Sequence, residues 1–139
     1  SIAHKLGAAF GIPHGRMNSI LLPHVIRYNA KKPEKFATFP KYEHFIADKR
    51  YAEIARFLGL PARTTEEGVE NLVNAVIKLA KEINMPLSMK ECGVKEEELE
   101  AQIKELADRA FEDQCTTANP KMPLVSELEE IIRSAYKGV

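Results

Sequence analysis

A repeated helical spacing of apolar residues is the feature that most constrains the fold of this chain. Between residues 64 and 84 the apolar side chains recur at i, i+3, i+4 and i+7, which places them on one face of a helix. They are Val69, Leu72, Val73, Val76, Ile77, Ala80 and Ile83. Residues 95–113 and 126–137 repeat the pattern, with inward positions at Leu99, Ile103, Leu106, Ala110, Leu128, Ile131, Ile132 and Ala135. No segment alternates convincingly with the period of two typical of a half-buried strand. We therefore predict an all-α fold, a bundle of six or seven helices.

Capping signals mark where several of these helices begin and end. Thr64 with Glu67 forms a capping box at the start of the helix over 64–84. Ser126 with Glu129 predicts the same device for the last helix, and Ser88 with Glu91 predicts a capped short turn closed by Gly93. A further helix is expected over 49–58, ending before Gly59 and Pro61. The acidic run at 96–98 suits the N-terminus of a helix, which favours negative charge, better than a metal site.

The first thirty residues hold three of the four histidines and the most apolar run of the chain. We expect a short helix over 1–10, ended by Gly11 and Pro13, and a second helix over 16–29. The second is apolar nearly all round, which predicts a buried helix, and Pro23 predicts a kink or a broken start within it. His24 in that helix is most simply a core histidine whose hydrogen bonds are satisfied.

His14 lies in the break between these two helices, in the segment 11–15 that reads Gly-Ile-Pro-His-Gly. Pro13 fixes φ and Gly15 permits a tight backbone, so the imidazole is held on a rigid corner that faces the interior. That geometry suits a metal ligand. A histidine that caps a helix or forms an ordinary hydrogen bond would give the same pattern, and spacing alone does not decide between them.

Residues 31–48 differ from the rest, because two prolines and mixed charges argue against regular structure. Four aromatic residues of this segment are expected to pin it to the body, namely Phe36, Phe39, Tyr42 and Phe45. A surface for a partner protein is the alternative. His44, among these aromatics, is interpreted as structural or exposed.

Composition narrows the class of protein. The length of 139 residues fits one domain, and a net charge of zero argues against a broad nucleic-acid surface. No apolar run approaches the roughly 20 residues of a membrane span. Two cysteines give no disulfide framework, and the first residues do not resemble a signal peptide, so a cytoplasmic protein is expected.

The charge is unevenly distributed along the chain. Residues 1–63 carry 11 Lys/Arg against 4 Asp/Glu, and residues 64–139 carry 9 against 16. The halves could attract each other or meet other domains or subunits, although solvated helix faces account for most such charges. The sequence also begins at Ser1 inside a predicted helix and without Met, which suggests a fragment, or removal of Met before a small residue.

Three strings in the first thirty residues closely resemble the iron-containing alcohol dehydrogenase family: Ala-His-Lys-Leu-Gly-Ala at 3–8, Ile-Pro-His-Gly at 12–15 and Leu-Pro-His-Val-Ile-Arg-Tyr-Asn-Ala at 22–30. Asp-Gln-Cys-Thr at 113–116 and Ala-Asn-Pro-Lys at 118–121 resemble the C-terminal signature of that family. The stretches 39–43, 51–55 and 58–60 are similar to one branch, the bifunctional aldehyde–alcohol dehydrogenases of fermenting microbes. The resemblance covers essentially the whole chain.

The resemblance implies a fold and a site. Members of the family have an N-terminal α/β nucleotide-binding half and an all-helical C-terminal half, with Fe²⁺, or sometimes Zn²⁺, in the cleft between them. One Asp and three His hold the metal, and His14 matches the last of these ligands. His4 matches a histidine beside the nicotinamide that is thought to help move protons, and the preceding ligand would fall just before Ser1. Cys115 matches a cysteine that lines the substrate pocket. A helix histidine bonded to backbone and a plain buried cysteine are the simpler alternatives for His4 and Cys115.

On this resemblance, residues 1–139 form the metal-side domain of an NAD-dependent enzyme that interconverts short aldehydes and primary alcohols, without its nucleotide-binding half. The chain keeps one metal ligand of four, and a single imidazole does not hold Fe²⁺ against water. We therefore expect no dehydrogenase activity and no strong metal site from the isolated chain. Self-association is expected, because the apolar face of residues 1–28 lacks its cleft partner. A stand-alone helical oligomerisation or regulatory module, and a single-function alcohol or glycerol dehydrogenase, are the alternatives.

Overall fold

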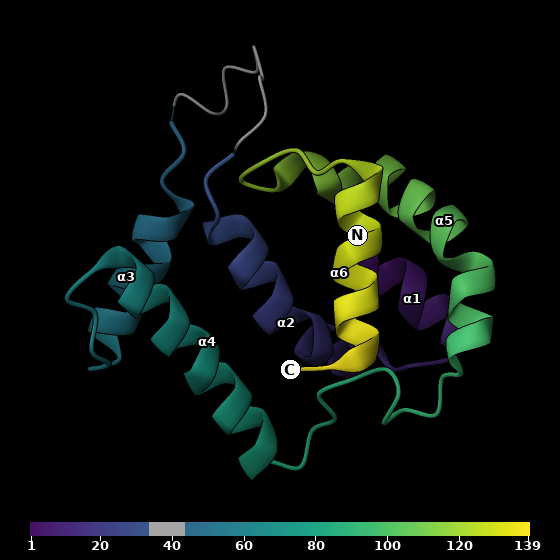
Figure 1. The fold of residues 1–139 in the computed structure, drawn as a ribbon, viewed down its shortest axis with the longest axis horizontal. Helices are drawn as coiled ribbons and strands as arrows, with labels where there is room; N and C mark the ends of the chain where they lie inside the picture. The colour runs from purple at the N-terminus through teal and green to yellow at the C-terminus, as the bar shows by residue number, and fades with distance from the viewer. Residues whose placement is uncertain (34–43) are drawn as a thin grey trace.

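The computed structural model describes residues 1–33 and 44–139, and this part of the chain is helical, with no strand (Figure 1). Its helices in chain order are α1 (Ile2–Phe10), α2 (His14–Ala30), α3 (Ala47–Phe57), α4 (Thr65–Glu82), α5 (Glu96–Glu112), the 3₁₀ helix η2 (Gln114–Ala118) and α6 (Val125–Lys137). The predicted all-α bundle of six or seven helices is confirmed for the residues that the structure describes.

The helices form two groups that meet at α2. In Figure 1, α6 stands between α2 and the pair α1 and α5, and it packs against both α2 and α5. Helices α3 and α4 pack closely against each other, and both also contact α2. A Cβ added at Gly68 would lie only 2.9 Å from the Cβ of Ala52, so the glycine is what allows α4 to approach α3 this closely. Helix α2 therefore carries contacts to both groups.

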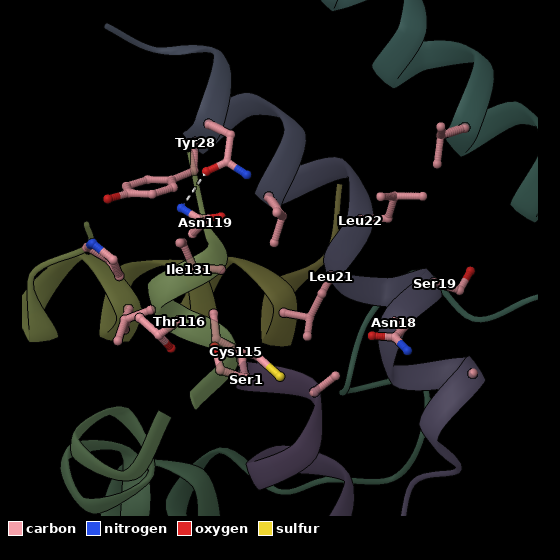
Figure 2. Close-up of a pocket in the computed structure, with 18 of the residues that line it drawn as sticks. Ser1, Asn18, Ser19, Leu21, Leu22, Tyr28, Cys115, Thr116, Asn119 and Ile131 are labelled. Carbon is pink, nitrogen blue, oxygen red and sulfur yellow. Dashed lines mark hydrogen bonds between the residues drawn. The ribbon is translucent and has the colours of Figure 1, made fainter. Parts of the chain in front are cut away.

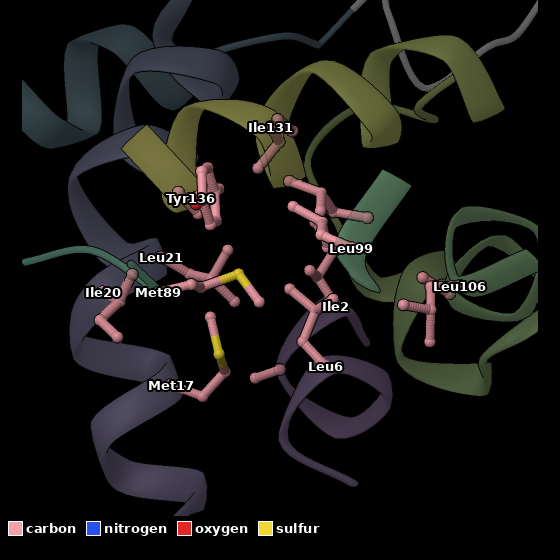
Figure 3. Packing of buried hydrophobic residues seen from close by; sticks show 14 of the residues in the cluster. Ile2, Leu6, Met17, Ile20, Leu21, Met89, Leu99, Leu106, Ile131 and Tyr136 are labelled. Atoms are coloured by element: carbon pink, nitrogen blue, oxygen red, sulfur yellow. The ribbon is translucent and has the colours of Figure 1, made fainter. Parts of the chain in front are cut away.

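The main core lies among α1, α2, α5, α6 and the turn that precedes α5, as Figure 3 shows. Its most deeply buried side chains include Leu6, Met17, Ile20, Met89, Leu99 and Ile132. The apolar stripes predicted for α5 and α6 are buried throughout. The stripe of α4 is buried at Val73 but reaches solvent at Ile83, which is 59% exposed. The C-terminal half of α4 is thus left partly uncovered, and it forms one wall of the cavity described below.

The predicted caps are confirmed at α4 and at the turn near Ser88. The Thr64 hydroxyl accepts a hydrogen bond from the Glu67 N–H at 3.1 Å, and the Ser88 hydroxyl accepts one from the Glu91 N–H at 3.1 Å. The prediction for the last helix was wrong. Helix α6 starts at Val125, and the Glu127 carboxylate, not Ser126 with Glu129, caps it by accepting the Leu124 N–H at 2.8 Å.

Helix α2 runs without a break through the buried Pro23, and it differs from its prediction in two respects. It begins at His14, two residues earlier than expected. It is also not buried all round, because Leu22 and Arg27 are exposed. The exposed side borders a cavity and the solvent, while the opposite side packs into the core.

His24 is a further correction to the sequence-based interpretation. The side chain is half-buried, and its Nε2 atom is buried with no hydrogen-bond partner among the residues that the structure describes. Burial, and secondarily the nearby Arg27 cation, lower the pKa of His24 from its ordinary value of 6.5. The burial of His24 therefore disfavours its cation, and its ring is not fully hydrogen-bonded.

The segment 31–48 is only partly described, and the predicted aromatic contacts of Phe36, Phe39 and Tyr42 lie outside the described residues. Phe45 is half-buried and His44 is exposed, as expected for a structural or exposed histidine. The last two residues of the segment begin α3. Among the described residues, no helix is long and apolar enough to cross a membrane.

Candidate functional site

The corner between α1 and α2 sets the position of His14. Helix α1 ends at Gly11, which adopts a left-handed conformation with φ of 64°, and the Ile12 N–H then donates to the Gly7 carbonyl at 3.1 Å. A Cβ at Gly7 would lie 3.0 Å from the Ile12 oxygen, so a side chain there would crowd this contact. Pro13, with φ of −53° and ψ of 140°, leads directly into α2. The chain reverses within a few residues, and the start of α2 returns to the side of α1.

This reversal brings His4 and His14 together. Their imidazole rings are stacked with centroids 5.3 Å apart and an interplanar angle of 20°. Both residues are exposed, so the expectation that His14 faces the interior was wrong. The Asn18 amide, one turn further along α2, lies 2.9 Å from Nε2 of His14. The hydrogen-bonded histidine considered from the sequence is therefore present, and it stands beside the residue expected to move protons.

Asp113 anchors the other side of His4. Its Oδ2 atom lies 3.2 Å from Nδ1 of His4 and 3.3 Å from Nζ of Lys5, while Oδ1 accepts the Cys115 N–H at 2.9 Å. The side chain of Asp113 is only 8% exposed. The Cys115 N–H, followed by the contacts with His4 and Lys5, holds the pKa of Asp113 well below its ordinary 3.8. The carboxylate is therefore a charged hydrogen-bonding centre.

Polar contacts fasten η2 and the chain after it to the body. The Thr116 hydroxyl donates to the Ala110 carbonyl at 2.6 Å, so the first turn of η2 is tied to the end of α5. The Asn119 amide donates to the Asn29 side chain at 2.9 Å, the bond marked in Figure 2, and joins the segment to α2. The segment 114–123 thus contains a 3₁₀ helix held in place from two sides. These contacts fix the position of Cys115.

A cavity of about 600 Å³ opens beside the two histidines. Figure 2 shows Leu21 and Leu22 of α2, Ile131 of α6 and Cys115 of η2 around it, and the C-terminal half of α4 contributes Leu79, one of its exposed apolar side chains. The lining is mainly apolar, with Asn18, Ser19, Thr116 and Asn119 among its polar members. His4 and His14 do not line the cavity, but their neighbours Ala3 and Gly15 do. The histidine pair therefore lies at its edge.

The described residues offer one potential metal cluster, made of His4, Asp113 and Cys115, whose ligand atoms lie within 4.8 Å of one another. Lys5 and the Cys115 N–H already occupy the Asp113 carboxylate, so the geometry is that of a hydrogen-bonded cluster. His14 is not part of this cluster. An exposed imidazole on a fixed corner fits one position in a metal site whose other ligands come from outside this chain.

Three residues at this site were not assigned a role from the sequence: Lys5, Asn18 and Asp113. Asp113 lies within a string that resembles the family signature, and its position two residues before Cys115 is typical of a side chain that caps the following turn. Its contact with His4 joins residues 109 apart in the chain. No local pattern signals a contact of that range.

Comparisons of this sequence with known proteins all match it to members of one protein family. A sequence profile for the Fe-containing alcohol dehydrogenase family, C-terminal, matches residues 1–136. The chain is 51% identical over 138 residues to the aldehyde-alcohol dehydrogenase of Streptococcus pneumoniae, and 45% identical over 141 residues to the bifunctional aldehyde-alcohol dehydrogenase AdhE of Escherichia coli. These matches cover 99% of this chain and 16% of each relative.

A solved structure agrees with the sequence matches. The iron-containing alcohol dehydrogenase of Thermococcus thioreducens superposes with a TM-score of 0.79 at 30% sequence identity. The match covers 99% of this chain and 31% of that one. The helical arrangement described above is therefore also found as part of a larger, iron-containing protein.

Proposed function

The chain belongs to the Fe-containing alcohol dehydrogenase family, as its C-terminal part, and from this premise we propose that it forms the metal side of an NAD-linked, iron-dependent alcohol dehydrogenase. The proposed reaction interconverts short aldehydes and primary alcohols by hydride transfer. The observation that carries the proposal is the stack of His4 on His14 at the edge of an apolar cavity. Together they would provide a ligand and a proton-transfer group beside a space for a small apolar substrate.

Each histidine has a separate role in this proposal. His14 would contribute one imidazole to the metal, and the remaining ligands would come from residues outside this chain. When bound, the ion would act as a Lewis acid that polarises the carbonyl oxygen of the aldehyde. His4 would hold or release the proton of the alcohol, a task suited to an imidazole near neutral pH. The nicotinamide cofactor would donate or accept the hydride.

Cys115 would be a wall of the substrate pocket. Its position in the lining of the cavity supports this, and hydride transfer to a carbonyl needs no covalent intermediate. The exposed apolar side chains of α4 that share this cavity would be covered in the complete enzyme by the nucleotide-binding half. Without that half and its metal ligands, the isolated chain would be inactive and would bind no metal tightly.

The S. pneumoniae and E. coli relatives favour the bifunctional branch over a single-function dehydrogenase, since both are aldehyde-alcohol dehydrogenases. We further propose iron rather than zinc as the metal, a cytoplasmic location, and a homo-oligomeric complete enzyme with no nucleic-acid or membrane partner.

A chimera tests the proposal directly. The matched segment of the E. coli relative would be replaced by residues 1–139, and the chimera would be assayed for NADH oxidation with acetaldehyde and for iron content. We expect turnover and about one iron per chain, both strongly reduced by His14→Ala, with the purified 139-residue chain inactive under the same conditions. A chimera that binds NADH and iron yet turns over no aldehyde would contradict the proposal, as would turnover by the isolated chain.

The alternative is a non-catalytic helical interaction module, and one observation favours it. Helix α3 ends in exposed apolar side chains, with Phe57 90% exposed and Leu58 56% exposed. Concentration-dependent assembly of the isolated chain, together with an inactive chimera, would support the module over the enzyme.

A further inference from the structure

Asp113 approaches His4 through a particular nitrogen of the ring. The short contact of 3.2 Å joins the carboxylate to Nδ1 of His4. A carboxylate only accepts hydrogen bonds, so this contact requires a proton on Nδ1. In a neutral imidazole that proton leaves Nε2 unprotonated, with its lone pair directed away from Asp113.

Two contacts other than the one with His4 hold the Asp113 carboxylate in place. Its Oδ1 atom accepts the Cys115 N–H at 2.9 Å, so Asp113 caps η2 and its side chain cannot rotate without losing that bond. Lys5 adds a positive charge at 3.3 Å from Oδ2. These donors keep Asp113 ionised, which its low pKa also indicates. The ring of His14 lies against one face of His4, so His4 is fixed both at one edge and on one face.

We propose that Asp113 is the positioning residue of His4, which selects the Nδ1–H tautomer and leaves Nε2 free to accept and return the proton of the alcohol. This inference rests on the proton-transfer role proposed above for His4. In the direction of alcohol oxidation, the alcohol O–H bond breaks, its proton moves to Nε2, and the hydride leaves from carbon to the oxidised nicotinamide. In the direction of aldehyde reduction, Nε2 returns the proton to the oxygen. Asp113 stays ionised throughout and touches neither substrate nor cofactor.

The Asp113→Asn variant separates the effect of Asp113 on the His4 tautomer from its structural role as the cap of η2. Asparagine caps helices as well as aspartate does, and the Cys115 N–H would hold its carbonyl oxygen in the place of Oδ1. Its NH₂ group would then face His4 and donate to Nδ1, which reverses the tautomer. Asp113→Ser is a second variant, since serine also caps but is too short to reach the imidazole. Lys5→Met is the matched control, because it removes the other charged contact to Asp113 and leaves the carboxylate facing Nδ1.

The tautomer is measured first, in the full 139-residue chain labelled with ¹⁵N-histidine, at pH 8.5, above the ordinary histidine pKa of about 6.5. We expect the Nδ1–H form of His4 in the wild type and in Lys5→Met. We expect the Nε2–H form in Asp113→Asn and a mixture in Asp113→Ser. An Nε2–H form in the wild type, or the same form in the wild type and Asp113→Asn, would overturn the proposal. This readout is independent of any activity.

The kinetic consequence is measured in the chimera described above. Asp113→Asn is expected to lower kcat by about 10- to 100-fold with KM and iron content nearly unchanged, since general acid–base transfer is typically worth a factor of this order or more. A reversed tautomer with unchanged kcat would overturn the positioning role while leaving the proposed function intact. An inactive chimera with the wild-type tautomer intact would count against the proposed function instead.

Discussion

At the scale of single residues, the polar side chains of this domain have defined environments that set their charge. Asp113 collects hydrogen bonds from three neighbouring residues and stays ionised. His24 shows the opposite situation, because its Nε2 atom is buried without a partner in the described part of the chain and the cation is disfavoured. Two residues of the same titratable kind, His4 and His24, thus differ in whether a carboxylate or a cation lies beside them.

His24 gives a prediction about pH. Because its pKa is lowered in the folded chain, the unfolded chain binds more protons as pH falls below 6.5. The contribution of the neutral His24 to the free energy of unfolding should therefore be fully present above pH 6.5 and decrease as the pH falls below 6.5. His24→Gln removes this titration, so the fall in the urea midpoint between pH 7.5 and pH 5 should be smaller in this variant than in the wild type.

The exposed His44 supplies the control for this experiment. His44→Gln should leave the difference between the two urea midpoints as it is in the wild type. An equal effect of both substitutions would show that the burial of His24 is not the cause of the pH dependence.

At the scale of elements, local signals found every long helix, but they misplaced the starts of α2 and α3 by two residues and assigned the wrong cap to α6. The Thr64 and Ser88 caps are local hydrogen bonds over three residues, which sequence spacing predicts directly. The start of α6 depends on Glu127, whose carboxylate also accepts the hydroxyl of Tyr28, 99 residues away, at 2.6 Å. Ser126 does not cap the helix, because a tertiary contact with Tyr28 holds the Glu127 carboxylate in the capping position.

The correction at α6 can be tested by two alanine variants. Glu127→Ala should lower the free energy of unfolding by about 1 kcal/mol, a typical cost for losing a cap. Ser126→Ala should change it by less than about 0.5 kcal/mol, as for an exposed surface substitution. Urea denaturation followed by circular dichroism measures both.

Tyr28→Phe separates the contribution of the tertiary bond from that of the cap itself. A larger loss in Ser126→Ala than in Glu127→Ala would restore the capping assignment made from the sequence.

At the scale of the whole molecule, two hydrophobic clusters of unequal size hold the helices together in the part of the chain that the structure describes. The larger joins α1, α2, α5 and α6, and the smaller has Ile26, Val69 and Val73 at its centre and joins α4 to α2. Ion pairs also link the basic and acidic parts of the sequence, with Arg27 and Glu70 2.6 Å apart and Lys5 and Asp113 3.3 Å apart. The α3–α4 pair is thus fastened to the rest by the smaller set of contacts.

This inequality predicts local unfolding. Val73→Ala should cost about 1–3 kcal/mol and should speed hydrogen exchange mainly in α3 and α4, because it weakens the smaller cluster. Leu99→Ala, in the main cluster, should cost about 2–5 kcal/mol and speed exchange in all the helices. Hydrogen exchange read by mass spectrometry distinguishes the two patterns. Uniform acceleration in Val73→Ala would contradict the separation of the clusters.

The sequence by itself determined the helices and their inward faces. The spacing of apolar residues in α5 and α6 leads to burial because side chains three and four residues apart share one face of a helix. The break at Gly11 and Pro13 likewise ends one helix and starts another for local steric reasons. The resemblance placed His4, His14 and Cys115 in one site, but without their geometry.

Only the tertiary structure decided which residues meet across the chain. The contact of Asp113 with His4 and the contact of Tyr28 with Glu127 each join segments about a hundred residues apart, and the cavity appears only where α4 leaves part of its apolar stripe uncovered. Local spacing constrains neighbours within a few residues, because those contacts follow from helical geometry alone. Contacts at long range depend on how the finished helices pack, which no single segment encodes.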